Sequence, residues 1–205
     1  MNVGRDLKRL STGEGAERSS VEAARELARR AAAEGLVDVA VATMDSPIGE
    51  LTVAVTGRGL ATVAFEGESR DVLFDRLARE LSPRVMEADA PTDEIRFELE
   101  EYFAGGRRRF DIKVDRTLIG PFAWKVLQAT SKVGYGELAT YGEIAGRIDR
   151  PAAARAVGSA LGSNPIPIVI PCHRIVGANG RLTGYAGGLA RKETLLRLEG
   201  SLMSA

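Results

Sequence analysis

The chain has 205 residues, of which 44% are hydrophobic and 27% are charged, and its formal net charge at pH 7 is zero. This is the composition of a globular protein that is long enough for one large domain or two small ones. No stretch approaches the roughly 20 consecutive apolar residues of a membrane span, and the N-terminus lacks the pattern of a signal peptide. We therefore expect a cytoplasmic protein with no membrane partner.

The chain contains a single cysteine and a single histidine. One cysteine cannot form an internal disulfide, and this pair falls short of the four ligands of a structural zinc site. We expect no bound metal.

The zero net charge hides an asymmetry between the two halves. Residues 1–115 carry 17 Lys and Arg against 23 Asp and Glu, whereas residues 116–205 carry 11 against 5. A basic half attracts a polyanion such as DNA, although two solvated surfaces of different composition give the same count.

Residues 1–38 are rich in Ala, Arg and Glu, and Ser19 and Glu22 have the spacing of a helix N-terminus. We expect an N-terminal extension that is helical or disordered.

Residues 39–115 predict a small acidic α+β domain. Its short β-branched runs and turn signals predict three antiparallel strands, at 39–44, 51–56 and 60–65. Two helices at 70–81 and 93–103 and a further strand at 110–114 complete the predicted elements.

Residues 116–205 predict a mainly helical second domain. Pro121 is a suitable first residue for a helix that continues to Val133. Thr140 and Glu143 have capping-box spacing for a second helix, which residues 149–151 terminate before a third helix at 152–161. Two short helices joined by a tight turn predict a helix-turn-helix.

The helix at 152–161 has small residues on both faces. We expect an inward stripe formed by Ala153, Ala156, Val157, Ala160 and Leu161. The predicted outer face consists of Ala152, Ala154, Arg155, Gly158 and Ser159. A helix that reads the major groove needs several long polar side chains, so one arginine among small residues suggests close approach to a backbone or a narrow groove. Packing against another helix would explain the small residues equally well.

The segment from Asn164 to Arg174 places the only cysteine, Cys172, beside the only histidine, His173. A thiol is a strong nucleophile only as thiolate, and the imidazole together with Arg174 would lower its pKa. Three prolines stiffen this segment. Direct contact between adjacent side chains is not assured, so we expect one water to carry the proton. An inert cysteine in a core strand is the alternative.

A glycine-rich loop follows at 180–189, and its aromatic Tyr185 is suited to stack on a ring at the wall of a narrow pocket. The last predicted helix, 190–199, ends with Glu199, where an acid is unfavourable for the helix dipole unless it has a partner. His173 is a candidate partner, and an ordinary surface glutamate is the alternative.

Taken together, the stretches 155–160, 168–174 and 183–189 closely resemble the signature of the O6-alkylguanine-DNA alkyltransferase family. The similarity extends over roughly 43–199 and is strongest from Pro121 onward. It implies a ribonuclease-H-like N-terminal domain and a C-terminal domain with a winged helix-turn-helix. It also implies stoichiometric, suicidal transfer of a methyl or larger alkyl group from O6 of guanine to Cys172, with no cofactor.

The resemblance assigns roles to individual residues. His173 is implied as a water-mediated base that Glu199 orients. Arg155 is implied to replace the flipped nucleotide in the base stack. Tyr141 is implied either to press on the target phosphate and rotate the nucleotide, or to hydrogen-bond the base as O6 is released. Asn164 is implied to tie the recognition helix to the reactive segment. The implied guanine pocket and its support consist of Arg174, Tyr185, Ala186 and Gly187.

The implied partner is alkylated double-stranded DNA, bound in the minor groove with little sequence specificity. We expect a monomer, and cooperative binding on DNA and activity on O4-alkylthymine stay open. Two other classes of protein are alternatives. A non-catalytic damage-binding protein would lack the cysteine, and a Cys-His-Glu hydrolase would need an oxyanion loop that the sequence does not display.

Overall fold

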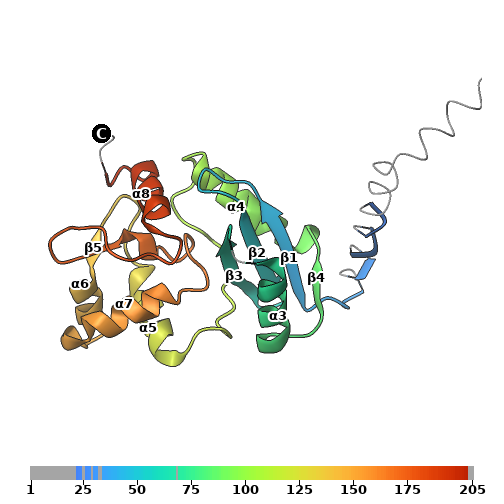
Figure 1. The fold of residues 1–205 in the computed structure, drawn as a ribbon, viewed down its shortest axis with the longest axis horizontal. Coiled ribbons are helices and arrows are strands. Elements are labelled where there is room, and N and C mark those ends of the chain that lie inside the picture. The colour runs from blue at the N-terminus through green and yellow to red at the C-terminus, as the bar shows by residue number, and fades with distance from the viewer. Residues whose placement is uncertain (1–21, 25, 29, 32–33, 68, 203–205) are drawn as a thin grey trace, which may run out of the picture.

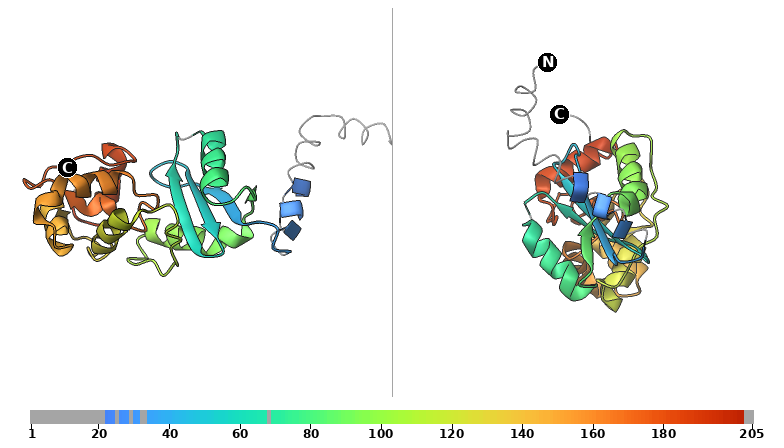
Figure 2. Two further views of the ribbon diagram at one scale, coloured as in Figure 1. Left: turned by 90° about the horizontal axis from the view of Figure 1, so that it is seen from below. Right: turned by 90° about the vertical axis from the view of Figure 1, so that its right-hand side faces the viewer.

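The computed structural model describes residues 22–24, 26–28, 30–31, 34–67 and 69–202. Those described between 22 and 31 are helical, and the predicted capping residue Ser19 lies outside the described part of the chain. Two lobes stand side by side, with the described helical residues between 22 and 31 at the end remote from the C-terminal lobe (Figures 1 and 2). No helix among the described residues is long and apolar enough to cross a membrane.

The N-terminal lobe is built on a four-stranded sheet. Its strands are β1 (Val39–Met44), β2 (Leu51–Thr56), β3 (Gly59–Phe65) and β4 (Val85–Glu87), in the order β3-β2-β1-β4. The first three pair antiparallel as predicted, whereas the unpredicted β4 pairs parallel to β1. β4 is too short to show an alternating pattern.

Helices α3 (Arg70–Glu80) and α4 (Asp93–Phe103) cover opposite faces of this sheet (Figure 2). Val39 and Val41 contribute to the core that includes Leu73 of α3, while Ala40 belongs to the larger core. Burial on both faces explains why β1 is a nearly continuous apolar run.

The strand predicted at 110–114 is wrong. These residues run without regular structure, apart from one bridge between Val114 and Leu60. The backbone crosses the edge of the sheet here and continues toward the second lobe (Figure 1), so only one position pairs with β3.

The described residues of the C-terminal lobe form four α-helices and a two-stranded parallel sheet. The helices are α5 (Pro121–Thr130), α6 (Tyr141–Arg147), α7 (Ala154–Gly162) and α8 (Leu189–Leu198). The strands are β5 (Ala139–Thr140) and β6 (Ile175–Val176). Two short 3-10 turns of this lobe are η2 (Pro151–Ala153) and η3 (Cys172–Arg174), and a third, η1 (Ala90–Thr92), precedes α4 in the N-terminal lobe. Pro121 opens α5 as predicted, but α5 ends three residues before Val133.

Helices α6 and α7 form the predicted helix-turn-helix. The turn contains Asp149 with a φ of 58°, and η2 leads into α7. On α7 the residues Val157, Ala160 and Leu161 are buried as expected, but Ala156 is exposed, so its predicted inward position is wrong. Ala154 and Gly158, predicted outside, are half-buried, whereas Ala152, Arg155 and Ser159 are exposed. One turn of 3-10 helix before α7 shifts the register from that of a regular helix begun at 152.

A single core joins the two lobes. Buried residues of the sheet, of α4 and of the C-terminal helices belong to one contiguous cluster. Strand β3 also binds the segment from Asn164 to Arg174 directly, because the Val63 amide and the Thr62 hydroxyl donate to the Pro165 carbonyl at 2.8 and 2.9 Å. This segment is therefore held by the N-terminal lobe as well as by its own.

The capping box of α6 generates a stability prediction. The Thr140 hydroxyl accepts from the Glu143 amide, and the Glu143 carboxylate accepts from the Thr140 amide. We expect Thr140→Ala to lower the free energy of unfolding by about 1 kcal/mol, because an amide of the first turn loses its acceptor. Thr140→Ser keeps the hydroxyl and should lose much less in denaturant titrations. Equal losses in the two variants would mean that the cap contributes little.

Candidate active site

Asn164 lies two residues after the end of α7 and organises the segment that leads to Cys172. Its side-chain amide donates to the Ile170 carbonyl at 3.0 Å and to Cys172 Sγ at 3.2 Å, and its side-chain oxygen accepts from the Ile166 amide. Asn164 is buried. One side chain thus connects the end of α7 with the thiol.

The backbone between Asn164 and Cys172 is irregular, in agreement with its three prolines. Ile168 is fully buried at a φ of 74°, a conformation that a β-branched residue rarely adopts. Such backbone persists only where surrounding contacts determine it. Here the Pro165 carbonyl is fixed by β3, and the Ile170 amide donates to Ile166.

Cys172 begins η3 and is 5% exposed. Burial raises the pKa of its thiol to about 11, and the hydrogen bond from Asn164 and the charge of Lys192 offset only part of that effect. This contradicts the expected lowering of the thiol pKa by His173 and Arg174. The thiol is therefore protonated at neutral pH and must lose its proton to a base in order to react.

His173 is fully buried, and its Nε2 lies 2.9 Å from Glu199 Oε1. Burial lowers the pKa of His173 although the hydrogen bond with Glu199 opposes this, so the ring is neutral at pH 7. Burial raises the pKa of Glu199, but hydrogen bonds from His173 and Arg174 outweigh it and bring the pKa to about 2. Glu199 is thus an ionised acceptor, which assigns the ring proton to Nε2 and leaves Nδ1 as a base.

The Nδ1 atom of His173 is buried and has no hydrogen-bond partner among the described residues. Nor is any hydrogen bond formed between the side chains of Cys172 and His173 within that part of the chain. Glu199 is 5% exposed and caps α8, so it is no surface glutamate.

Arg174 is paired with Glu199 and not with the thiol. Its Nε donates to Glu199 Oε2 at 2.8 Å, its Nη2 donates to Oε1 at 2.9 Å, and its Nη1 donates to the Val133 carbonyl. This buried two-pronged pair fixes the plane of the carboxylate.

The glycine-rich loop brings Tyr185 close to His173, with ring centroids 6.5 Å apart. The Tyr185 hydroxyl is buried without a partner among the described residues, and burial raises its pKa. Phe65 of β3 meets Tyr185 edge-on at 5.7 Å. A Cβ on Gly187 would approach the Phe65 and Tyr185 rings to 2.8 and 2.9 Å, so only glycine fits there. Ala186 is exposed.

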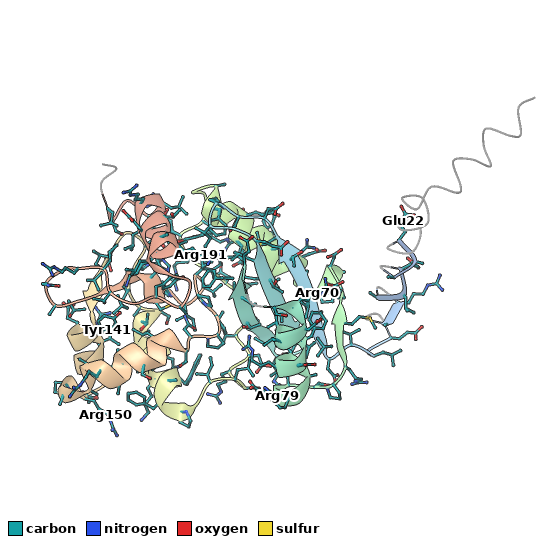
Figure 3. All side chains as sticks on the ribbon, viewed as in Figure 1. Glu22, Arg70, Arg79, Tyr141, Arg150 and Arg191 are labelled. Atoms are coloured by element: carbon teal, nitrogen blue, oxygen red, sulfur yellow. The ribbon has the colours of Figure 1, made fainter. Side chains whose placement is uncertain are left out.

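Tyr141 begins α6 and lies between α7 and the glycine-rich loop. Its ring would be 3.6 Å from a Cβ at Gly158, and its hydroxyl accepts from the Thr183 hydroxyl at 3.1 Å. Arg155 makes no hydrogen bond or ion pair within the described residues and is exposed. Figure 3 shows Tyr141 and Arg150 on the helix-turn-helix side of the C-terminal lobe.

Three residues around this site are not recognisable from the sequence. Lys192 is fully buried, with burial lowering its pKa to about 8, and its ammonium donates to the carbonyls of Ile175 and Thr183. Tyr102 donates to Glu199 from the other lobe. Arg191 donates to the Ile48 and Gly187 carbonyls and lies over the Phe65 ring, at the junction of the lobes (Figure 3). Lys and Arg side chains are usually exposed, so the residue types of Lys192 and Arg191 do not indicate a role in a buried site.

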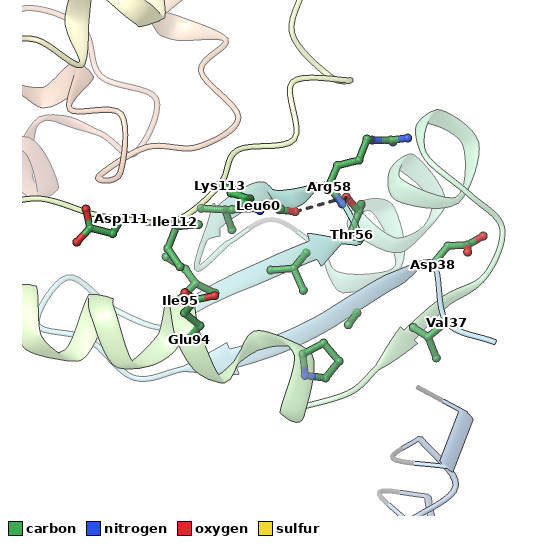
Figure 4. Close-up of a pocket in the computed structure, with 15 residues that line it drawn as sticks. Val37, Asp38, Thr56, Arg58, Leu60, Glu94, Ile95, Asp111, Ile112 and Lys113 are labelled. Atoms are coloured by element: carbon green, nitrogen blue, oxygen red, sulfur yellow. Dashed lines mark hydrogen bonds between the residues drawn. The ribbon is translucent and has the colours of Figure 1, made fainter. Parts of the chain in front are cut away.

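The N-terminal lobe contains a hollow that shares no lining residue with this site. It lies between the sheet, α4 and residues 111–113 (Figure 4). Two of the charged groups that line it are already paired, Asp38 with Arg84 and Arg58 with Asp115. The described residues contain no group of three or more His, Cys, Asp or Glu side chains that could hold a metal ion.

Comparison with known proteins gives matches over both lobes. The family model for the 6-O-methylguanine DNA methyltransferase ribonuclease-like domain matches residues 39–116, and that for the DNA binding domain of the same family matches residues 121–201. The chain is 43% identical over 162 residues to the methylated-DNA–protein-cysteine methyltransferase of Methanosarcina acetivorans, covering 78% of this chain and 97% of that protein. It is 45% identical over 158 residues to the enzyme of the same name from Mycolicibacterium paratuberculosis, covering 77% and 90%.

Solved structures agree with these matches. The O6-methylguanine methyltransferase of Mycobacterium tuberculosis superposes with a TM-score of 0.68 at 41% identity, covering 82% of this chain and 96% of that one. The Mycobacterium tuberculosis OGT in complex with DNA superposes with a TM-score of 0.67 at 41% identity, covering 79% and 93%.

The ionised Glu199 generates a pH prediction. Because its folded pKa of about 2 is below the ordinary value of 4.5, its contribution to stability is fully present above pH 4.5 and is lost as the pH falls toward 2. A shift of this size corresponds to about 3 kcal/mol. We expect Glu199→Gln to be less stable than the wild type at pH 7, with the difference shrinking toward pH 2. A difference that stays constant from pH 7 to pH 2 in denaturant titrations would contradict this account of Glu199.

Proposed function

The chain belongs to the 6-O-methylguanine DNA methyltransferase family, and we propose that Cys172 is the residue that accepts the alkyl group. It is a methylated-DNA–protein-cysteine methyltransferase that repairs DNA by transferring a methyl group from O6-methylguanine to its own cysteine. Since the chain contains one cysteine, Cys172 alone can be the acceptor. The observation that carries the proposal is its position, held by Asn164 beside the buried His173–Glu199 pair.

The chemistry is an in-line displacement at the alkyl carbon. The sulfur–carbon bond forms as the carbon–O6 bond breaks, which leaves an S-alkyl-cysteine and guanine. His173 Nδ1 takes the thiol proton through one water molecule, Glu199 stabilises the imidazolium, and the proton passes finally to the released guanine. A thiol that is protonated at rest, next to a neutral base with a free Nδ1, fits this order of events. The thioether is stable, so each molecule acts once.

Asn164 and Arg174 are positioning residues in this proposal. Asn164 aims Sγ, and Arg174 holds the Glu199 carboxylate that orients His173. Tyr185 and the backbone at Ala186 and Gly187 form one wall of the guanine pocket. His173 Nδ1 and the Tyr185 hydroxyl are buried near Cys172 without a hydrogen-bond partner among the described residues, which supports a polar ligand at this place.

DNA is the partner, and we propose binding of alkylated duplex in its minor groove through α7 with little sequence specificity. The exposed small residues Ala152, Ala156 and Ser159 favour close approach of a backbone. Arg155 is the one long side chain exposed among them and would fill the base stack after the nucleotide flips out. The half-buried Ala154 and Gly158 support this helix, since Gly158 receives the ring of Tyr141. Tyr141 would act on the target phosphate or on the leaving base.

Several expectations from the sequence stay predictions. They are the domain boundaries at 38 and 115, the monomeric state, cooperative binding on DNA, the cytoplasmic location and activity on O4-alkylthymine.

Stoichiometric transfer is tested by intact mass and peptide mapping after incubation with a duplex that contains O6-methylguanine. We expect a gain of one methyl group on Cys172, saturating at one per molecule, and none in Cys172→Ala. Tight binding without a mass change would instead identify a damage-binding protein. Repaired product in excess of protein would identify a turnover enzyme of the hydrolase class.

Base flipping is tested with Arg155→Ala. Removing the inserted side chain should slow single-turnover transfer from duplex DNA by roughly 10- to 100-fold, because the vacated stack is no longer filled. Transfer from free O6-methylguanine base needs no flipping and should change little. Arg150→Ala, in the exposed turn before α7, is the matched control and should keep the duplex rate at saturating DNA. Equal slowing of Arg155→Ala on duplex and free base would contradict this role.

A further inference from the structure

Tyr102 brings the N-terminal lobe into the His173–Glu199 pair. It lies on the last turn of α4, is fully buried, and its hydroxyl donates to Glu199 Oε1 at 2.7 Å across 97 positions of sequence. Its ring is fixed by Phe103, Phe110 and Tyr135 at centroid distances of 5.3 to 6.2 Å. The hydroxyl therefore has one orientation available, toward the carboxylate.

The two oxygens of Glu199 are fully used. Oε1 accepts from the Tyr102 hydroxyl at 2.7 Å and lies 2.9 Å from both His173 Nε2 and Arg174 Nη2. Oε2 accepts from Arg174 Nε and, at 3.4 Å, from the Gly136 amide. A carboxylate has about four lone-pair sites, so three donors on Oε1 share one atom's charge. The negative charge of Oε1 therefore stabilises a protonated His173 less than it would if the other donors were absent.

The direction of the Tyr102 hydrogen bond is fixed. Burial raises the pKa of Tyr102 far above its ordinary value, and the charge of Glu199 adds to that effect, so the phenol stays protonated. An ionised carboxylate only accepts hydrogen bonds. Tyr102 is thus a permanent donor to the oxygen that faces His173.

We infer that Tyr102 is a positioning residue of the methyl transfer: it holds Glu199 Oε1 in place and limits the basicity of His173, so that the ring stays neutral until Cys172 gives up its proton. The inference rests on the proposed role of His173 as the base. It also assigns a reactive-site contribution to the N-terminal lobe, whose helix α4 carries this hydroxyl to Glu199 at the end of α8.

Charged and titratable groups on every neighbouring element bear on His173. Arg174 of η3 and Lys192 of α8 disfavour the imidazolium, while Glu199 favours it. Cys172 adjoins His173 on η3, and Tyr185 of the glycine-rich loop packs edge-on against it. The Tyr135 hydroxyl, near Glu199, donates to the Leu198 carbonyl at 3.0 Å and not to the carboxylate. Within the described part of the chain, only Tyr102 and Arg174 donate hydrogen bonds to the Oε1 atom that His173 also contacts.

The test uses the single histidine of the chain. Because His173 is alone, the imidazole signals of ¹⁵N-histidine-labelled full-length protein report its protonation without assignment. Tyr102→Phe removes the donor and keeps the ring. Tyr135→Phe is the matched control, since it removes a hydroxyl of the same aromatic cluster that binds a backbone carbonyl. Both are compared with wild type by titration and by single-turnover methyl transfer across pH.

We expect Tyr102→Phe to move the His173 midpoint, and with it the acid limb of the rate profile, up by about one pH unit, the order expected for one hydrogen bond to an ionised group. Tyr135→Phe should move neither. Site-specific incorporation of 3-fluorotyrosine at position 102 gives a stronger hydrogen-bond donor of nearly the same volume. It should move the His173 midpoint down, and it tests the inference even if Tyr102→Phe folds poorly. The inference would be overturned if the His173 midpoint were unchanged in both variants of position 102, or if Tyr102→Phe and Tyr135→Phe shifted it equally. Absence of methyl transfer by the wild type would overturn the proposed function but leave the titration readable.

Discussion

The buried carboxylate of Glu199 is the constraint on which the rest of the site depends. An ionised group removed from water costs several kcal/mol unless donors replace its hydration. Here the donors come from α4, from the loop at Gly136 and from η3. Each donor must therefore stay where it is, and the ring of His173 is fixed as a consequence. The reactive geometry is thus set by the need to solvate one charge with protein groups drawn from both lobes.

The position of the Cys172 thiol depends on the path of the backbone that precedes it. The chain between Asn164 and Cys172 forms no regular element, so prolines, a left-handed Ile168 and hydrogen bonds from β3 determine its path. This path buries Cys172 and keeps it protonated, a state in which a thiol reacts slowly with stray electrophiles. If each molecule acts once, as proposed, a thiol that stays protonated until a base removes its proton is preserved for the intended substrate. The burial that raises the thiol pKa is therefore compatible with function and not opposed to it.

Local chemistry made much of the fold predictable. The capping box at Thr140, the proline at the start of α5 and the alternation of turns and β-branched runs each act within a few residues, and the corresponding elements form. What failed depends on contacts between distant parts of the chain. The three residues of β4 form a strand because β1 lies beside them, and residues 110–114 do not form one because they cross the sheet edge. Likewise, the sign of the Cys172 pKa shift follows from burial, which residue types near it in sequence do not reveal.

The same distinction explains why Tyr102 and Lys192 were missed although Asn164, His173 and Glu199 were found. The latter three are recognisable from a resemblance carried by motifs, whereas Tyr102 contacts Glu199 only because α4 packs against the C-terminal lobe. The groups that fix the reactive centre are buried and mutually bonded, while Arg155 is exposed and carries no partner among the described residues. This division is compatible with the proposed binding of DNA with little sequence specificity. The buried groups keep one arrangement, and the exposed side chain proposed to enter the duplex is not held by them.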